Sequence, residues 1–279
     1  MAKIPFLAKK KIYNLSHGEE NTRPDVILGN SVPFAIAEAY KTARTNIQFV
    51  TADDKCKILP VTSSIPGEGK TITCINTASC LAQNDNKVLL IDADMRKPQI
   101  ATALGLQKSP GLSDILASLI KADAPDPYCR QKSNIPNLDV ITAGKTPPNP
   151  AELLAGKKMS ALLEALSAEY DYILIDTPPV LVVTDALVLA PLVSGYVLVV
   201  RAGVTHGEVL RETVARFETL NAKICGFMLN GQRSKTGSYG RYGKYGKYGK
   251  YGKYGNYGRY GNYDKFDRFD NGGDGANGN

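Results

Sequence analysis

Tryptophan is absent from this 279-residue sequence, histidine occurs only twice, and the five cysteines show no paired spacing. A zinc site or a disulfide framework needs Cys pairs such as CxxC, so neither is indicated and we expect buried, reduced thiols. His17 and His206 lie far apart and have no metal-ligand partner at helical spacing. Metal clusters and histidine-based catalysis are therefore not favoured. The cysteines are Cys56, Cys74, Cys80, Cys129 and Cys225.

A long apolar run is also lacking. The best stretch, Val180 to Val200, is interrupted by Thr184-Asp185 and by Ser194-Gly195, whereas a membrane helix needs about 20 consecutive apolar residues. The basic N-terminus, with lysines at 9, 10 and 11, has neither the apolar core nor the cleavage site of a secretory signal. The sequence thus predicts a cytoplasmic chain that does not cross a bilayer by itself.

Positive charge is concentrated at one end. The formal net charge is +7, and residues 231–279, with ten Lys/Arg and four Asp, carry +6 of it. In this tail Tyr recurs at every third position, with Gly between and no Pro, which excludes collagen. Without aliphatic residues to bury, the tail is predicted to be disordered.

Short β-branched apolar runs alternate with amphipathic stretches between residues 57 and 230. This alternation predicts an α/β fold with a mostly parallel sheet and helices on both faces, in three layers. In such folds ligands bind at the carboxyl ends of the strands. The apolar runs are KILPVTSS, KVLLID, LDVITAG, YDYILID, GYVLVVRAG and KICGFMLN.

A helix is predicted ahead of the first of these strands. In residues 34–48 Ile36, Tyr40, Ala43 and Ile47 recur at helical spacing and form one apolar face. We therefore divide the chain into an N-terminal extension (1–33), an α/β domain (34–231) and the tail (232–279).

The first strand leads into a glycine-rich loop that ends in Lys-Thr. Strand, loop and helix in this order are typical of a phosphate-binding P-loop, although Ser64 stands where the usual motif has its first Gly. Gly67 and Gly69 permit backbone N–H groups to face phosphates, Lys70 is expected to reach the β and γ phosphates, and the Thr71 hydroxyl to bind Mg²⁺. The predicted nucleotide-binding segment is Ser64, Ile65, Pro66, Gly67, Glu68, Gly69, Lys70, Thr71 and Ile72.

Carboxylates follow two other predicted strands. Asp92 and Asp94 point the same way along an extended segment, where they can hold Mg²⁺ and accept a proton from an attacking hydroxyl. Arg96 can offset charge on a transferred phosphoryl group. Asp176 ends the strand YILID, followed by Thr-Pro-Pro, and is expected to complete the Mg²⁺ shell.

Two further polar residues stand at predicted strand ends. Arg201 follows the run VLVV and Asn230 follows GFML, positions at which the base of a nucleotide can be met. A role in loop capping remains an equal alternative for both.

The ordered motifs TSSIPGEGKT, LLIDADMRKP and ILIDTPP, preceded by EAYKTARTN and followed by a tyrosine cluster, resemble the bacterial tyrosine kinases of capsule and exopolysaccharide synthesis. The resemblance covers nearly the whole chain, which lacks the HRD and DFG motifs of eukaryotic protein kinases. It implies a P-loop kinase in which Lys70 and Thr71 bind Mg·ATP and Asp94 and Asp176 support the metal. Asp92 is then the candidate base for the tyrosine hydroxyl, with the roles of Asp92 and Asp94 interchangeable.

The resemblance also implies how the chain assembles. The family's Glu-x-x-Arg-x-x-Arg motif joins subunits into a ring, and it occurs here as Glu38, Lys41 and Arg44, with Lys41 lacking the planar fork of arginine. The Gram-positive type of the family is a separate chain at the inner face of the membrane, activated by the cytosolic segment of a transmembrane chain-length protein.

Tail tyrosines are then the expected autophosphorylation sites, reversed by a cognate tyrosine phosphatase. Other polysaccharide-synthesis proteins are possible further substrates. The implied sites are Tyr239, Tyr242, Tyr245, Tyr248, Tyr251, Tyr254, Tyr257, Tyr260 and Tyr263.

Two alternatives use the same residues differently. A partitioning or septum-positioning ATPase has this fold and the strand-end aspartates, but usually a lysine at the position of Ile65 and no tyrosine array. A nucleotide-dependent module could grip nucleic acid with the basic aromatic tail, yet that would leave Asp92, Asp94, Arg96 and Asp176 beside the P-loop unexplained. Nucleic acid is therefore not expected as a partner.

Overall fold

The computed structural model describes residues 2–5, 32–52, 55–118 and 126–232. The nine tail tyrosines predicted to be phosphorylated, most of the predicted N-terminal extension and His17 lie outside the described residues.

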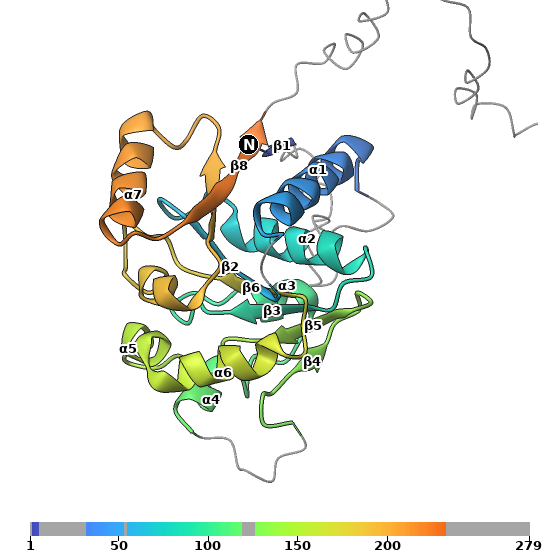
Figure 1. The fold of residues 1–279 in the computed structure, drawn as a ribbon, viewed down its shortest axis with the longest axis vertical. Helices are drawn as coiled ribbons and strands as arrows, with labels where there is room; N and C mark the ends of the chain where they lie inside the picture. The colour runs from blue at the N-terminus through green and yellow to red at the C-terminus, as the bar shows by residue number, and fades with distance from the viewer. Residues whose placement is uncertain (1, 6–31, 53–54, 119–125, 233–279) are drawn as a thin grey trace, which may run out of the picture. The chain divides into compact units, whose positions relative to one another are not determined.

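An eight-stranded sheet forms the centre of the domain, in the order β1-β8-β7-β2-β6-β3-β5-β4 (Figure 1). All neighbouring strands are parallel except β4 and β5, which confirms the mostly parallel sheet. The strands are β1 (Ala2–Pro5), β2 (Lys57–Ser63), β3 (Val88–Asp92), β4 (Gln131–Lys132), β5 (Leu138–Ile141), β6 (Tyr172–Asp176), β7 (Tyr196–Arg201) and β8 (Ile224–Gln232).

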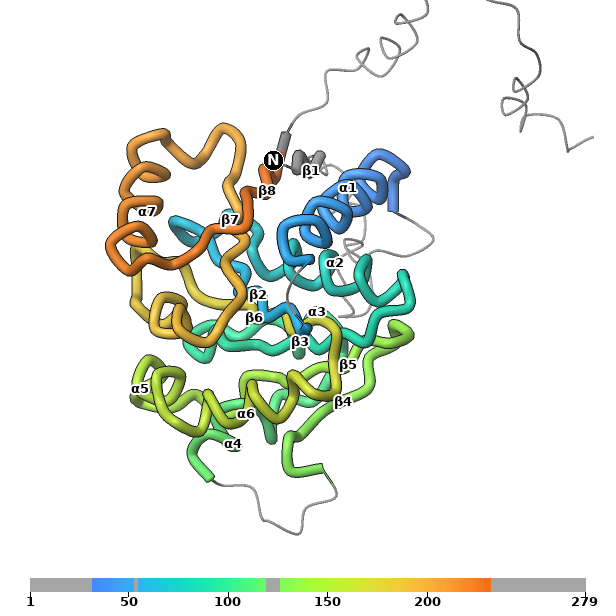
Figure 2. The backbone as a smooth tube through the Cα atoms, viewed as in Figure 1, coloured from blue at the N-terminus to red at the C-terminus, as the bar shows by residue number. Residues whose placement is uncertain are grey.

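Helices cover both faces of the sheet, so the predicted three-layer architecture is also confirmed. In Figures 1 and 2, α1 and α2 lie on one side of the strands and α5 and α6 on the other. The helices are α1 (Phe34–Val50), α2 (Lys70–Ala82), α3 (Ile100–Leu104), α4 (Leu112–Leu116), α5 (Pro150–Ala155), α6 (Lys157–Ser167) and α7 (Gly207–Thr219), with the 3₁₀ helix η2 (Leu187–Leu192).

Side chains that alternate along the strands form two separate hydrophobic cores, one on each face of the sheet. Leu90 of β3 and Leu174 of β6 pack in the cluster beneath α1 and α2. Their chain neighbours Leu89 and Ile173 face the opposite cluster, which α4, α5 and α6 cover. Because successive side chains of a strand point to opposite faces, a run that is apolar throughout belongs to a strand covered on both sides.

Helix α1 buries the face that its sequence indicates. Ile36, Tyr40, Ala43 and Ile47 are all buried, as predicted, and belong to the same cluster as α2. The opposite side of α1 is open to solvent. The helix packs against α2, β1 and β8.

Two exclusions made from the sequence can be compared with the fold. No helix within the described ranges is long and apolar enough to cross a membrane. The five cysteines form no disulfide, but only Cys74 and Cys80 are buried; the other three are partly exposed, so the expectation of five buried thiols was wrong in part. Cys56 and Cys129 lie in loops and Cys225 at the start of β8, and Cys56 and Cys225 still pack against the edges of the hydrophobic clusters.

Candidate active site

The site forms where β2, β6 and β3 lie side by side. Within the sheet β6 pairs with both other strands, and its last residue, Asp176, stands opposite Val61 of β2 and Asp92 of β3. The loop after β2 and the carboxylates that end the other two strands are therefore brought to the same edge. This is the edge at which parallel α/β sheets bind ligands.

The glycine-rich loop occupies residues 64–69, and α2 begins at Lys70. Gly67 and Gly69 have φ angles of +82° and +89°, in the left-handed region that favours glycine. The N-terminus of a 13-residue helix thus starts directly behind the loop. Its first N–H groups and its dipole provide a site for phosphate oxygens.

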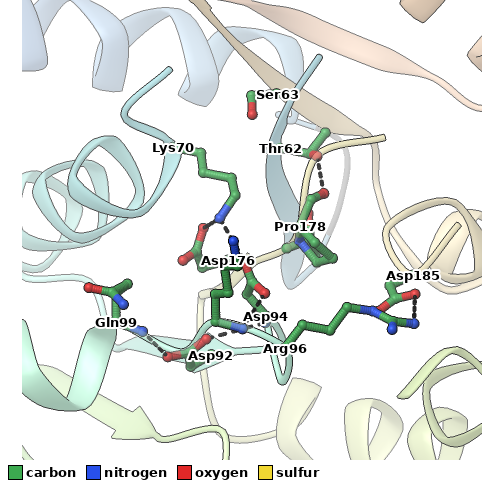
Figure 3. A network of polar contacts seen from close by, with 12 residues as sticks. Thr62, Ser63, Lys70, Asp92, Asp94, Arg96, Gln99, Asp176, Pro178 and Asp185 are labelled. Carbon is green, nitrogen blue, oxygen red and sulfur yellow. Dashed lines mark hydrogen bonds and ion pairs between the residues drawn. The ribbon is translucent and has the colours of Figure 1, made fainter. Parts of the chain in front are cut away.

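Lys70 lies among the strand-end carboxylates. Its Nζ is 2.8 Å from Asp94 Oδ2 and 3.9 Å from Asp176 Oδ1, and Figure 3 shows the side chain reaching down to this pair. Burial acts to lower the pKa of Lys70, but the negative charges of Asp176 and Asp94 outweigh it and raise the pKa overall. The ammonium group therefore remains charged at neutral pH.

Asp92 is fully buried, and backbone N–H groups bind both of its carboxylate oxygens. Oδ1 accepts from Asp94 N at 3.2 Å, while Oδ2 accepts from Gln99 N at 3.2 Å and Ile100 N at 3.1 Å, at the start of α3. Burial, reinforced by the nearby charge of Asp176, raises its pKa to about 8. The side chain thus holds the loop between β3 and α3 and is unusually basic for a carboxylate.

Asp176 has a different environment. It is fully buried, yet neither of its oxygens accepts a short hydrogen bond from the described residues. Burial raises its pKa to about 6, an effect that Lys70 and the Thr71 hydroxyl oppose. The Thr62 hydroxyl donates to Pro178 O at 2.8 Å, which ties the Thr-Pro-Pro segment after β6 to β2 (Figure 3).

This arrangement fits a magnesium ion bound together with a nucleotide. A buried carboxylate that accepts no short hydrogen bond from the described residues can accept a cation, and Mg²⁺ is usually held by one or two carboxylates plus phosphates and water. The described residues contain no group of three or more His, Cys, Asp or Glu placed to hold a metal unaided. Thr71, Asp94 and Asp176, predicted as metal ligands, all lie at this position.

Arg96 extends away from Lys70 and ends at Asp185, as Figure 3 shows. Its Nε donates to Asp185 Oδ2 at 2.9 Å and its Nη2 to Oδ1 at 3.0 Å. Asp185 is fully buried, whereas the Arg96 side chain is 43% exposed. The pair joins the loop after β3 to the loop after β6.

Arg201 and Asn230 contact the backbone of the glycine-rich loop. They are directly paired across β7 and β8. Arg201 Nη1 donates to Gly67 O at 2.6 Å, and Asn230 Nδ2 donates to Glu68 O at 2.9 Å. The structure therefore places both beside the loop, and both support its shape.

The remaining loop residues differ in exposure. Ser64 is buried, and its Oγ receives a 2.8 Å hydrogen bond from the Thr213 hydroxyl of α7. Pro66 is exposed, while Ile72 packs partly buried against the core beneath α1 and α2. Side chains at the two ends of the loop thus anchor it to the protein.

The residues predicted to join subunits lie on α1. Lys41 Nζ forms an exposed ion pair with Glu38 at 2.8 Å. Arg44 Nη1 donates to Cys80 O in the last turn of α2 at 3.1 Å, so this arginine already binds within its own chain. The Glu38 and Lys41 side chains are thus about half exposed, whereas Arg44 is held against α2.

Three residues of the site were not predicted from the sequence. Asp185 was noted only as an interruption of an apolar run, and Thr205 and Thr213 carry no motif. Each contacts a site residue at least 89 positions away in the chain. No local pattern could have revealed these contacts.

The fold and this combination of phosphate loop, helix N-terminus and strand-end carboxylates define a nucleotide-binding protein of the P-loop class. Residues 56–223 match the family model described as AAA domain. Tyrosine-protein kinase YwqD of Bacillus subtilis (strain 168) is 43% identical over 204 residues, which cover 73% of this chain and 84% of that protein.

Other relatives agree with this match. Tyrosine-protein kinase Ptk of Acinetobacter johnsonii is 34% identical over 77% of this chain, which spans only 29% of that longer protein. Among solved structures, the kinase domain of the Escherichia coli tyrosine kinase ETK matches with a TM-score of 0.75 at 32% identity, covering 84% of this chain and 90% of that domain. The chain belongs to the bacterial tyrosine-protein kinases, enzymes that transfer phosphate from ATP to protein tyrosine.

Proposed function

We propose that this kinase phosphorylates the tyrosines of its own C-terminal tail, in trans between subunits of a ring, and thereby regulates capsular or exopolysaccharide synthesis and export. The observation that carries the proposal is Lys70 held among Asp94 and Asp176 at the end of a phosphate loop, in a chain whose tail repeats tyrosine. An array of nine regularly spaced tyrosines has no use in an enzyme that only hydrolyses ATP.

In this proposal Lys70 leaves Asp94 when ATP enters, and its ammonium group binds the β and γ phosphates. Thr71, Asp94 and Asp176 would hold Mg²⁺, which would neutralise charge on the phosphates. The released Asp94 carboxylate and the buried Asp176 are positioned for this because both already face the ammonium group. The backbone of the glycine-rich loop orients the phosphate chain.

Asp92 is the proposed acceptor of the tyrosine proton. A carboxyl group with a pKa of about 8 is mostly protonated at neutral pH, so Asp92 acts as a general base only in its ionised form, and turnover should rise as pH increases towards 8. Its three backbone hydrogen bonds mean that it also supports the β3–α3 loop, and Asp94 remains the alternative base. Asp92→Asn and Asp94→Asn, compared by turnover and by melting temperature, separate these roles.

Arg96 is proposed to stabilise charge on the transferred phosphoryl group, with Asp185 directing its guanidinium. Because Asp185 occupies Nε and Nη2, Arg96 has further N–H groups available. Arg201 and Asn230 are proposed to aid nucleotide binding indirectly, because their side chains hold the backbone of the glycine-rich loop.

Assembly and partners complete the proposal. Glu38, Lys41 and Arg44 are proposed to join subunits, and a transmembrane chain-length protein to recruit and activate the kinase through its cytosolic segment. The kinase would then work peripherally at the inner face of the membrane, and a cognate phosphatase would reverse the modification. In Ptk the matched region is a minor part of a longer chain, so further segments accompany a kinase region in that relative.

A mixture of two variants tests transfer between chains. One partner is the Lys70→Met chain, inactive but with all its tyrosines, and the other is an active chain in which the nine tyrosines from Tyr239 to Tyr263 are Phe. We expect mass spectrometry after incubation with Mg·ATP to find phosphate on the tail of the Lys70→Met chain. Phosphorylation of wild-type protein without transfer in the mixture would overturn the in-trans proposal.

A further inference from the structure

Glu68 is a carboxylate inside a loop built to receive phosphates. It is fully buried, and its Oε2 accepts a 2.9 Å hydrogen bond from Ile65 N within the same loop. A negative charge here would repel phosphate if it faced the ligand. The Glu68 carboxylate instead accepts a hydrogen bond from the backbone of its own loop and so stabilises the shape of the loop.

The other oxygen of Glu68 binds the hydroxyl of Thr205, which lies 137 positions further along the chain. Thr205 belongs to the turn between β7 and α7, and its Oγ1 also accepts from Arg201 N at 3.0 Å. Thr205 N donates to Arg201 O at 3.0 Å, which closes the turn. The hydroxyl therefore uses both its donor and its acceptor capacity, which a valine of the same shape could not do.

The same side of the loop is held at two further points. Arg201 Nη1 binds Gly67 O, and Asn230 Nδ2 binds Glu68 O. The Asn230 amide is so close that a Cβ added at Gly69 would lie 2.1 Å from its nitrogen. The ends of β7 and β8 thus fix the backbone of residues 65–69, which leaves the start of α2 free to meet phosphates.

We propose that Thr205 is a positioning residue for nucleotide binding, acting through Glu68 to hold the glycine-rich loop in its phosphate-binding shape. The inference rests on the proposed binding of ATP at this loop and extends it to a residue that never touches the phosphates. Hydrogen bonds to charged groups are stronger than neutral ones, and a buried carboxylate left without its donor is costly. Loss of the Thr205 hydroxyl should therefore loosen the loop.

Isothermal titration of full-length protein with Mg·ADP, and kinetics with Mg·ATP, test this inference. We expect Thr205→Val to weaken Mg·ADP binding and raise KM for ATP about tenfold, while kcat changes by less than about twofold, because Lys70 and the carboxylates are untouched. Thr205→Ser keeps the hydroxyl and should restore affinity to within about threefold of wild type. Glu68→Gln combined with Thr205→Val should cost less than the sum of the two single changes.

Thr219→Val is the matched control, since among the described residues the Thr219 hydroxyl bonds to Ala215 O within α7 and to no part of the glycine-rich loop. It should leave Mg·ADP affinity unchanged. Unchanged affinity in Thr205→Val, failure of Thr205→Ser to restore binding, or equal losses in Thr205→Val and Thr219→Val would each overturn the inference. Titration with ADP reads nucleotide binding alone, so a failure of tyrosine phosphorylation would leave this test intact.

Discussion

The ammonium nitrogen of Lys70 lies 2.8 Å from Asp94 Oδ2, and this ion pair occupies the place where phosphates are expected. Lysine at the end of a phosphate loop serves the β and γ phosphates when nucleotide is bound. In the structure, the Asp94 carboxylate supplies the negative charge next to this ammonium group. In the proposed mechanism, binding of ATP would exchange one anionic partner of Lys70 for another, and Asp94 would then be available to hold the metal.

Two buried carboxyl groups make the stability of the folded protein depend on pH. Asp92 and Asp176, which face Lys70 and Asp94, have pKa values of about 8 and about 6, raised mainly by burial, against about 4 in an unfolded chain. The folded state therefore keeps protons that the unfolded state has lost, and stability falls as pH rises from about 4 to about 8. We expect the free energy of unfolding in urea to drop by about 5 kcal/mol between pH 5 and pH 8, with the larger share from Asp92.

The control for this prediction is the double variant Asp92→Asn/Asp176→Asn. Other titrating groups are the same in both proteins, so the difference between their pH profiles isolates the two carboxylates. The variant should have the flatter profile, and profiles with equal slopes would contradict the assignment.

Gly69→Ala and Gly67→Ala form a matched pair in the loop. Both positions have left-handed φ, which costs about 1 kcal/mol for alanine, but a Cβ at Gly67 meets nothing within 4 Å. A Cβ at Gly69 would collide with Asn230 Nδ2. Denaturant unfolding should show a loss of about 1 kcal/mol for Gly67→Ala and about 2–4 kcal/mol for Gly69→Ala.

The collision can be relieved independently. In the Asn230→Ala background, Gly69→Ala should cost about as little as Gly67→Ala does. A Gly69→Ala cost that is the same with and without the Asn230 side chain would show that the close contact is not responsible.

Replacement of Arg96 by lysine tests the need for its planar fork. Two parallel hydrogen bonds to Asp185 fix the guanidinium, and lysine cannot reproduce them. We expect Arg96→Lys to lower kcat for tail phosphorylation by about 10²-fold, nearly as much as Arg96→Ala, and Asp185→Asn to lower kcat as well. Near wild-type turnover in Arg96→Lys would mean that a positive charge alone suffices.

Lys41 and Arg44 should affect different properties. The Lys41–Glu38 ion pair is exposed, so Lys41→Ala should change stability by less than about 1 kcal/mol. Arg44 bonds to the last turn of α2, so Arg44→Ala should lower the melting temperature.

If α1 joins subunits, mass photometry should show larger oligomers for Lys41→Arg than for wild type, and an unchanged mass distribution would contradict that role for Lys41.

Local patterns in the sequence were sufficient to predict much of the fold. The four apolar residues of α1, the glycine-rich loop between β2 and α2, and the strands ending in Asp92 and Asp176 each follow from spacing over fewer than 20 residues. The sheet then brings Asp92 opposite Asp176 because the strands that they end are neighbours. The prediction of a parallel sheet was enough to place the candidate site at the carboxyl ends of the strands.

Other features depend on contacts between distant segments. Residues Ala2–Pro5 form an edge strand that pairs with β8. Four residues are too few to show the alternation of apolar and polar side chains by which a strand is predicted. Asp185 beneath Arg96 and Thr205 beside Glu68 also depend on how loops of different strands meet. Sequence periodicity reports which face of an element is buried, and it does not report which loop side chains will touch.

The most direct test of the account is to incubate the wild-type protein and Lys70→Met separately with Mg·ATP and to map phosphotyrosine by mass spectrometry while measuring released phosphate. Addition of the cytosolic segment of the chain-length protein serves as a second condition. We expect phosphate on tyrosines between 239 and 263 in the wild type and none in Lys70→Met. Steady ATP hydrolysis with unmodified tail tyrosines under both conditions would contradict it.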